Sequence, residues 1–120
     1  MDAPASPAGF VAAAHAALAA AGVDGELHVA VAFVGPAEIQ ELNREHRGRD
    51  RPTDVLSFPV DGSGPASGPR ELGDVVICPE HTEDLAEAVV HGVLHLCGYD
   101  HETDDGEMLT LQDRVMEELR

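Results

Sequence analysis

Hydrophobic positions along the chain follow two patterns, and each pattern predicts one kind of element. Apolar residues that recur every three or four positions bury one side of a helix, as in the segment that begins at Pro7. A short and nearly continuous apolar run, ELHVAVAFV at 26–34, predicts a strand with both faces at least partly covered. The predicted order is helix 7–21, strand 26–34, helix 36–48, strand 54–60, strand 72–78, helix 82–97 and helix 103–120.

Glycine and proline mark where these elements end. Gly22, Gly48 and Gly98 each follow a helical pattern and are expected to end the three helices that precede them. Pro59 has no backbone N–H, so strand 54–60 is expected to end there or to lie at an edge of the sheet. The segment 61–70 (DGSGPASGPR) predicts a flexible connection, which makes the two strands beside it a hairpin with a long loop.

The two longest apolar helices are expected to differ in burial. Helix 82–97 is expected to be the buried helix, because apolar side chains surround most of its circumference: Leu85, Val89, Val90, Val93, Leu94 and Leu96. Helix 7–21 is expected to lie at the surface, with one apolar face packed against the core: Phe10, Ala14, Leu18 and Ala21. Neither an internal repeat nor a second domain is indicated.

The charge of the chain changes which ligands are plausible. Its formal charge is −16, from 23 acidic residues against seven arginines and no lysine. Such a chain is a poor general binder of nucleic acid, because contacts to phosphate need cations. Four of the seven arginines nevertheless fall within eight residues and predict a local positive patch on an acidic body: Arg44, Arg47, Arg49 and Arg51.

Cysteines and the N-terminal region bear on the cellular compartment. Cys78 and Cys97 lie in apolar runs and are expected to be buried free thiols, since their spacing fits neither a disulfide framework nor a metal finger. The apolar segment 8–22 is too short to span a bilayer, and Asp2 stands where a signal peptide has a positive charge. The sequence therefore predicts a cytoplasmic protein with no membrane contact.

The segment 91–101 (HGVLHLCGYDH) carries the candidate chemistry. His91 and His95 are four residues apart on a predicted helix, so both rings project from one face and can reach one ion at about 2.0–2.1 Å. Gly98 allows the chain to turn, so that His101 can fold back over the same ion. Three imidazoles leave a fourth position open, which is typical of a catalytic metal site; zinc is favoured, with nickel, cobalt or manganese as alternatives. His15, His28, His46 and His81 receive no functional role.

The spacing H-x3-H-x2-G-x2-H is shared with the metzincin proteases. In those enzymes a glutamate follows the first histidine and acts as the general base, whereas this chain has Gly92. The small side chains of Ala88 and Gly92, on the same helix face, are expected to leave room for a metal and its substrate. The missing glutamate argues against peptide hydrolysis.

Three blocks of sequence carry a resemblance to a known family: 42–59 (LNREHRGRDRPTDVLSFP), 72–80 (LGDVVICPE) and 89–101 (VVHGVLHLCGYDH). On these blocks the chain resembles the YbeY family of bacterial endoribonucleases and ribosomal RNA maturation factors, as a shortened member. The resemblance implies an α+β fold in a single domain, residues 1–120, with a small mixed β-sheet packed with helices and a metzincin-like metal helix. It also implies one zinc ion per chain on His91, His95 and His101.

The same resemblance implies a function. The expected activity is zinc-dependent, single-strand-specific endoribonuclease cleavage in ribosomal RNA maturation and ribosome quality control, with RNA and possible ribosomal proteins as partners. The family's functionally important arginine corresponds to Arg47, which is expected to hold a phosphate. Two roles are open for Asp100, which either orients a ligand imidazole or shapes the turn, and Asp74 is expected to solvate a strand.

The chain departs from the family pattern in two ways. The Pro-rich start does not supply the short first strand that members usually have, and the segment 81–90 before the ligand helix is short, so a smaller sheet and a more open cleft are expected.

Two competing functions remain. The first is a non-catalytic ribosome-assembly factor with a structural metal site. The second is a metallopeptidase that works without the usual glutamate.

Overall fold

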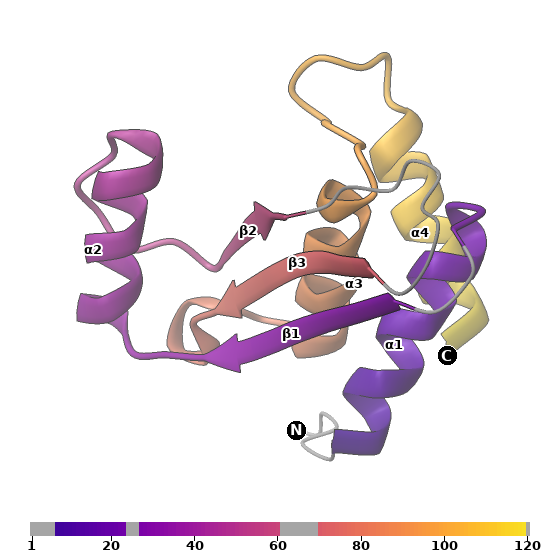
Figure 1. The fold of residues 1–120 in the computed structure, drawn as a ribbon, viewed down its shortest axis with the longest axis horizontal. Coiled ribbons are helices and arrows are strands. Elements are labelled where there is room, and N and C mark those ends of the chain that lie inside the picture. The colour runs from indigo at the N-terminus through magenta and orange to yellow at the C-terminus, as the bar shows by residue number, and fades with distance from the viewer. Residues whose placement is uncertain (1–6, 24–26, 61–69, 120) are drawn as a thin grey trace.

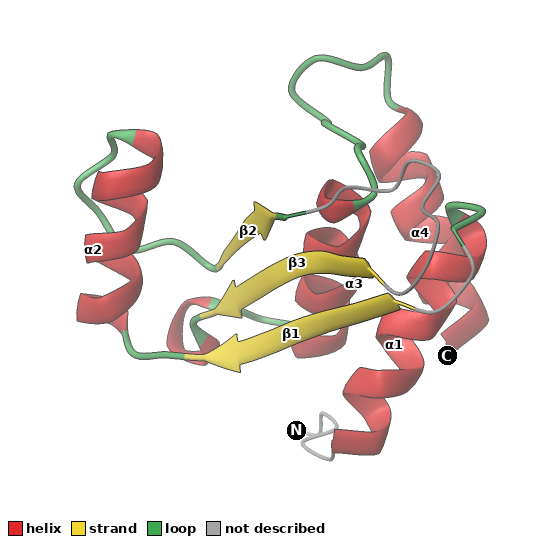
Figure 2. Cartoon of the chain, viewed as in Figure 1, coloured by secondary structure: helices red, strands yellow, loops and turns green. Residues whose placement is uncertain are grey.

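The computed structural model describes residues 7–23, 27–60 and 70–119 (Figure 1). Within these ranges the elements are α1 (Pro7–Ala20), β1 (Leu27–Phe33), α2 (Pro36–Arg47), β2 (Val55–Pro59), β3 (Arg70–Ile77), a 3-10 turn (Pro79–His81), α3 (Leu85–Leu96) and α4 (Glu107–Leu119). Figure 2 shows the strands side by side in one sheet, with α3 behind the sheet, α1 and α4 at one end of it and α2 at the other. This arrangement confirms the predicted α+β class.

The sheet is mixed and has the order β1-β3-β2. β1 pairs in parallel with β3, with Val31 opposite Val75, and β2 pairs antiparallel with β3, with Ser57 opposite the same Val75. β2 is therefore an edge strand that ends at Pro59, as its proline predicted. The predicted hairpin of β2 and β3 is also confirmed, although β3 begins at Arg70, inside the segment expected to be a loop. The rest of that segment, 61–69, lies outside the described residues.

One face of the sheet packs against α3. Val75 and Ile77 of the central strand are fully buried on this face, and α3 contributes seven buried residues, which confirms that it is the buried helix. α1 and α4 pack against α3 from its other sides. The residues of α1 that are fully buried are Ala13 and Ala17, whereas the predicted face, centred on Ala14 and Leu18, lies at the margin of the contact. Small side chains at the centre allow the two helices to approach closely.

A separate and smaller hydrophobic cluster attaches α2 to the opposite face of the sheet. Ile39 of α2 is fully buried there against Leu56 of β2 and Cys78. The buried Asn43 side chain donates a hydrogen bond to the carbonyl of Arg51 at 2.9 Å and holds the chain that follows the helix. Gly48 ends α2 in a left-handed conformation with φ of 71°, as predicted for this position.

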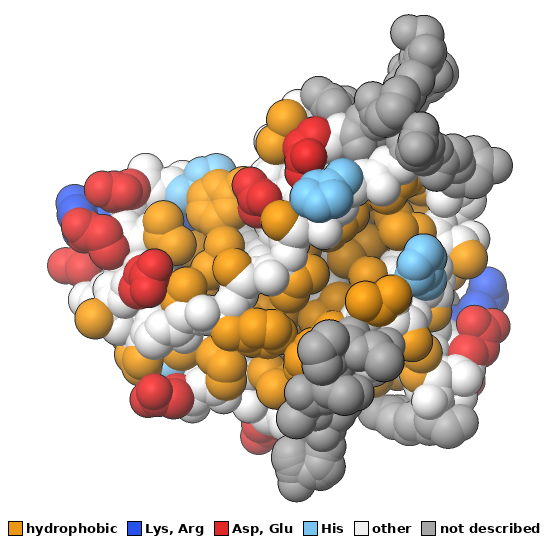
Figure 3. All heavy atoms as spheres, turned by 60° about the horizontal axis from the view of Figure 1, so that its bottom comes forward, with side chains coloured by type: hydrophobic (Ala, Val, Ile, Leu, Met, Phe, Trp, Pro, Cys, Tyr) orange, Lys and Arg blue, Asp and Glu red, His pale blue; other side chains and the backbone are white. Residues whose placement is uncertain are grey.

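β1 is covered more on one face than on the other. It is an edge strand of the described sheet, its residues His28 and Ala32 are exposed, and Phe33 is 43% exposed. The prediction was that both faces are at least partly covered. Val29 and Val31 are half-buried against the main core, and on the other face Ala30 is half-buried while its neighbours are exposed, so this second face is covered only in part. An apolar groove of about 600 Å³ lies between β1 and α1, on the face where Figure 3 shows hydrophobic side chains gathered.

Two helices begin later than the sequence predicted. α3 begins after Asp84, whose side chain accepts a hydrogen bond from the backbone N–H of Glu87 at 3.1 Å, and Thr82 instead donates to the carbonyl of Cys78. α4 begins at Glu107, because the carboxylate of Asp104 accepts hydrogen bonds from the N–H groups of Gly106 and Met108 and holds a turn before the helix. Asp84 is therefore the N-cap of α3, and Asp104 accepts from an N–H of the first turn of α4 from the turn that precedes the helix.

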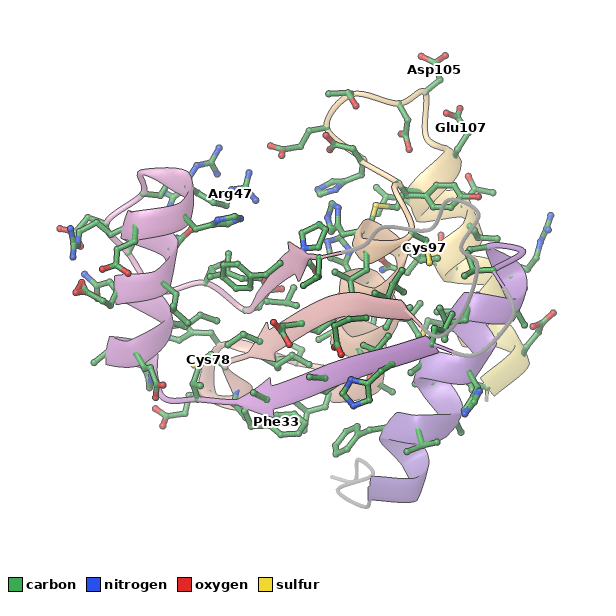
Figure 4. All side chains as sticks on the ribbon, in the orientation of Figure 1. Phe33, Arg47, Cys78, Cys97, Asp105 and Glu107 are labelled. Atoms are coloured by element: carbon green, nitrogen blue, oxygen red, sulfur yellow. The ribbon has the colours of Figure 1, made fainter. Side chains whose placement is uncertain are left out.

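Two further expectations concern the cysteines and the membrane. Cys78 is buried as predicted, but Cys97 is only half-buried, and Figure 4 shows the two at opposite ends of the sheet. In the described part of the chain, no helix has both the length and the apolar character needed to cross a membrane.

Candidate metal centre and cleft

The structure brings the three predicted histidines together. His91 and His95 lie one turn apart on α3, with ring centroids 4.8 Å from each other. Gly98 then adopts a φ of 100°, and the chain turns back so that the His101 ring lies 5.1 Å from His91 and 5.3 Å from His95. One ring nitrogen from each of the three lies within 4.8 Å of the others, so these histidines can hold a metal ion.

Two of the rings are oriented by hydrogen bonds at their Nδ1 atoms. His95 Nδ1 lies 2.9 Å from the carbonyl oxygen of Tyr99, and His91 Nδ1 lies 2.7 Å from Oε1 of Gln112. A carbonyl oxygen only accepts, so each Nδ1 carries the proton and donates it, which leaves the Nε2 lone pair available for a ligand. This arrangement, in which a neighbouring group fixes the tautomer, is typical of metal-binding histidines.

Gln112 was missed by sequence reasoning, although a signal for it exists. It lies on α4 four residues after Met108 and three before Val115, which are both fully buried. A polar residue in the middle of a buried helix face needs a hydrogen-bond partner, and this one finds His91. The pattern of α4 therefore pointed to a polar partner without revealing which residue it was.

The chemistry of the cluster fits a transition-metal ion. His101 Nδ1 is buried and has no hydrogen-bond partner among the described residues. Burial lowers the pKa of His95, and the neighbouring His91 lowers it further, so the neutral imidazole that a metal requires is favoured. A buried, unpartnered nitrogen costs about 1–3 kcal/mol, and a bound cation removes that cost.

Gly92 does not provide the space expected of it. A Cβ atom built on Gly92 lies 2.5 Å from Cγ1 of Val75 and 3.3 Å from Oγ of Ser57. The Ser57 hydroxyl also donates to the carbonyl of Gly92 at 2.9 Å. Gly92 therefore faces the sheet, and the expectation that it leaves room for a substrate is wrong: the glycine is needed because α3 and the sheet approach too closely for a side chain.

A polar cleft of about 790 Å³ extends from the histidines toward α2. Arg47, at the end of α2, lines this cleft together with all three histidines, and Figure 4 shows it on the side of α2 that faces the rest of the molecule. The Arg47 guanidinium donates to the Glu102 carboxylate at 3.0 Å, so an ion pair joins α2 to the turn that carries His101.

Asp100 also lines the cleft, but its described hydrogen bond belongs to the turn. Its carboxylate accepts from the backbone N–H of Glu102 at 3.0 Å, and its carbonyl accepts from the N–H of Asp104. Of the two roles left open for Asp100, these contacts support the shaping of the turn. Asp74 is exposed on the open face of the sheet, as expected for a solvating residue.

The other arginines of the predicted patch do not share one environment. Arg44 pairs with Glu41 on the same helix, and this carboxylate raises its pKa. Arg49 lines the cleft with Arg47, whereas Arg51 is exposed outside it. The positive charge available to a ligand in the cleft therefore comes from two arginines, not from all four.

These features define the class: a small α+β protein with a candidate metal site on an H-x3-H helix and an arginine lining the same polar cleft. Residues 8–120 match the model of the family described as Endoribonuclease YbeY. The chain belongs to this YbeY family.

The chain is also similar to curated proteins named endoribonuclease YbeY and to one solved structure. The one from Rubrobacter xylanophilus is 50% identical over 99 residues, covering 80% of this chain and 69% of that protein. The one from Persephonella marina is 39% identical over 109 residues, covering 78% and 71%. The solution structure of TM1509 from Thermotoga maritima has a TM-score of 0.54 and 31% identity, covering 98% of this chain and 85% of that one.

Proposed function

We propose that this chain is a zinc-dependent, single-strand-specific endoribonuclease, carried by residues 1–120 as one domain, that acts in ribosomal RNA maturation and ribosome quality control in the cytoplasm. The observation that carries the proposal is the shared cleft, in which three clustered histidines and Arg47 line one space of about 790 Å³. Family membership supports endoribonuclease activity. The choice of ribosomal RNA and of ribosomal proteins as partners rests on the family resemblance.

Arg47 is proposed to hold a phosphate of the RNA. Its guanidinium offers paired N–H donors that match phosphate oxygens, and these donors offset the charge that develops on a phosphodiester under attack. In the structure one of these donors, on Nη2, bonds to Oε1 of Glu102, whose carboxylate is an anion of similar geometry. An RNA phosphate therefore replaces Glu102 as the partner of Arg47.

His91, His95 and His101 are proposed as the zinc ligands. When bound, an ion at such a site polarises a phosphoryl oxygen and lowers the pKa of water toward about 7. Gln112 and the Tyr99 carbonyl hold the His91 and His95 rings in the tautomer that presents Nε2. The loss of either hydrogen bond is expected to let the ring rotate away.

The test measures zinc content and RNA cleavage on the same purified variants. Arg47→Ala is expected to keep one zinc per chain and to lose about 100-fold in kcat/KM on single-stranded RNA, because one donor to the transition state is removed. Arg47→Lys recovers only part of this loss, since lysine cannot form the paired contact. Arg51→Ala is the matched control from outside the cleft and stays within about twofold of the wild type, because an exposed charge contributes little.

His95→Ala tests the metal ligands and the competing functions. It is expected to lose both zinc and cleavage. Cleavage that continues at the wild-type rate in zinc-free His95→Ala overturns the proposed site. RNA binding without cleavage, unchanged by zinc removal, supports the assembly factor, and hydrolysis of casein by the wild type supports the peptidase.

A further inference from the structure

His46 received no role in the sequence, yet the structure places it in the cleft. It lies on the last turn of α2, next to Arg47, and lines the same space as the three clustered histidines. Its side chain is exposed, and within the described ranges it makes neither a side-chain hydrogen bond nor an ion pair. The imidazole therefore has a free surface toward a ligand.

Phe58 supports the His46 ring from beneath. The two ring centroids are 4.5 Å apart, with an angle of 49° between the planes. Phe58 is half-buried and packs against the Ile39, Leu56 and Cys78 cluster that attaches α2 to the sheet. A ring that rests on a packed phenylalanine loses less conformational freedom on binding than a free side chain does.

This pair of rings matters because the chain has few aromatic residues. Only 3% of its residues are Phe, Trp or Tyr. Proteins that bind single-stranded nucleic acid stack successive bases on aromatic or imidazole rings, at about 1–3 kcal/mol per base. Of the described residues that line the cleft, His46 is the ring that adjoins the phosphate-binding candidate Arg47.

We infer that the His46 imidazole, backed by Phe58, is a stacking subsite for one nucleobase of a single-stranded RNA whose adjoining phosphate is held by Arg47. The inference rests on the proposed function and adds a residue that selects single-stranded over double-stranded RNA. A base in a duplex is already stacked between its neighbours, so it is not available to His46. Stacking on His46 therefore favours single-stranded over double-stranded RNA. Arg47 contributes a positive charge that attracts both forms alike.

The experiment measures binding to the metal-free 120-residue chain, so that no turnover occurs. The probes are a fluorescent ten-nucleotide oligouridylate, an abasic ribose-phosphate oligomer of the same length, and a duplex of the same length. The measured quantity is the ratio of the Kd for the abasic probe to the Kd for oligouridylate. For the wild type this ratio is expected to be about 10, which corresponds to about 1.4 kcal/mol for one stacked base.

Three variants separate stacking from other roles. His46→Leu keeps an apolar contact with Phe58 and is expected to bring the ratio close to 1, with the abasic Kd unchanged within about twofold. His46→Tyr keeps a ring and is expected to retain the ratio. His81→Leu, at an exposed histidine outside the cleft, is the matched control and leaves every Kd unchanged.

Each outcome bears on a definite claim. If His46→Tyr loses as much affinity as His46→Leu, the imidazole acts through a nitrogen and the stacking subsite is overturned. A ratio that stays near 10 in His46→Leu also overturns it, while the proposed function stands. If the wild type binds none of the three probes, the proposed function fails and the subsite fails with it.

Discussion

Replacing Gly92 by alanine tests whether the glycine of the HGVLH segment is required by packing. The new methyl group would lie 2.5 Å and 3.0 Å from the two Cγ atoms of Val75. Val75 is fully buried on the central strand β3, and its branched side chain has restricted rotation about χ1. Neither partner can therefore move without disturbing the contact between α3 and the sheet.

The expected magnitude comes from two opposing terms. Overpacking of a well-packed core costs about 1–3 kcal/mol, and a contact this short with an immobile neighbour favours the upper half of that range. Alanine stabilises a helix interior by about 1 kcal/mol relative to glycine. Gly92→Ala is therefore expected to lower the free energy of unfolding by about 1–2 kcal/mol.

Urea unfolding followed by far-ultraviolet circular dichroism measures this change. Ala19→Gly, at an exposed position of α1, measures the propensity term alone and is expected to cost about 1 kcal/mol. Val75→Ala removes the groups that clash, and the double variant is expected to show at least about 1 kcal/mol of favourable coupling with Gly92→Ala. A Gly92→Ala variant that is more stable than the wild type, or a coupling near zero, refutes the packing argument.

Three other perturbations have defined outcomes. Gln112→Leu removes the acceptor of His91 Nδ1 and is expected to weaken zinc binding by about 10- to 100-fold, measured by competition with a chelator. Glu102→Gln removes the competitor for Arg47 and is expected to lower KM for RNA several-fold without moving Tm, since the pair is 38% and 49% exposed; a raised KM contradicts this. The hydrogen bond and charge of Glu71 raise the pKa of His28 above 6.5. The pair therefore stabilises the fold below pH 6.5, and this contribution is lost as the pH rises through the raised pKa of His28. In an NMR titration, Glu71→Gln is expected to return the pKa of His28 toward 6.5.

The sequence predicted the elements well because their signals are local. Helical periodicity, a helix-ending glycine and a strand proline each act within a few residues, so α2, β2 and the burial of α3 followed from them. The clustering of three histidines was also predictable, since two of them share a helix face and the third follows a short turn. The late starts of α3 and α4 were missed because two aspartates compete with nearby threonines as caps.

The residues that the sequence misjudged depend on which surfaces meet in three dimensions. Gly92 was placed on the helix face of the two histidines, where it was expected to leave room for a substrate. The periodicity of α3 could not show that the sheet lies against Gly92, because apolar residues surround the helix. His46 and Phe58 are twelve residues apart, and only the packing of α2 on β2 brings their rings together. Such contacts between elements leave no periodic trace in the sequence.

Because α2 is attached through its own small cluster, the two walls of the cleft are held by different hydrophobic clusters. The wall with the three histidines belongs to the main core, whereas the wall with His46 and Arg47 belongs to the cluster of Ile39, Leu56 and Cys78. Regions that pack in separate clusters open with different free energies, so amide hydrogens of α2 are expected to exchange with solvent faster than those of α3. A local opening of α2 would change the distance between the wall that carries Arg47 and the wall that carries the three histidines, while the histidines, held by the main core, keep their geometry.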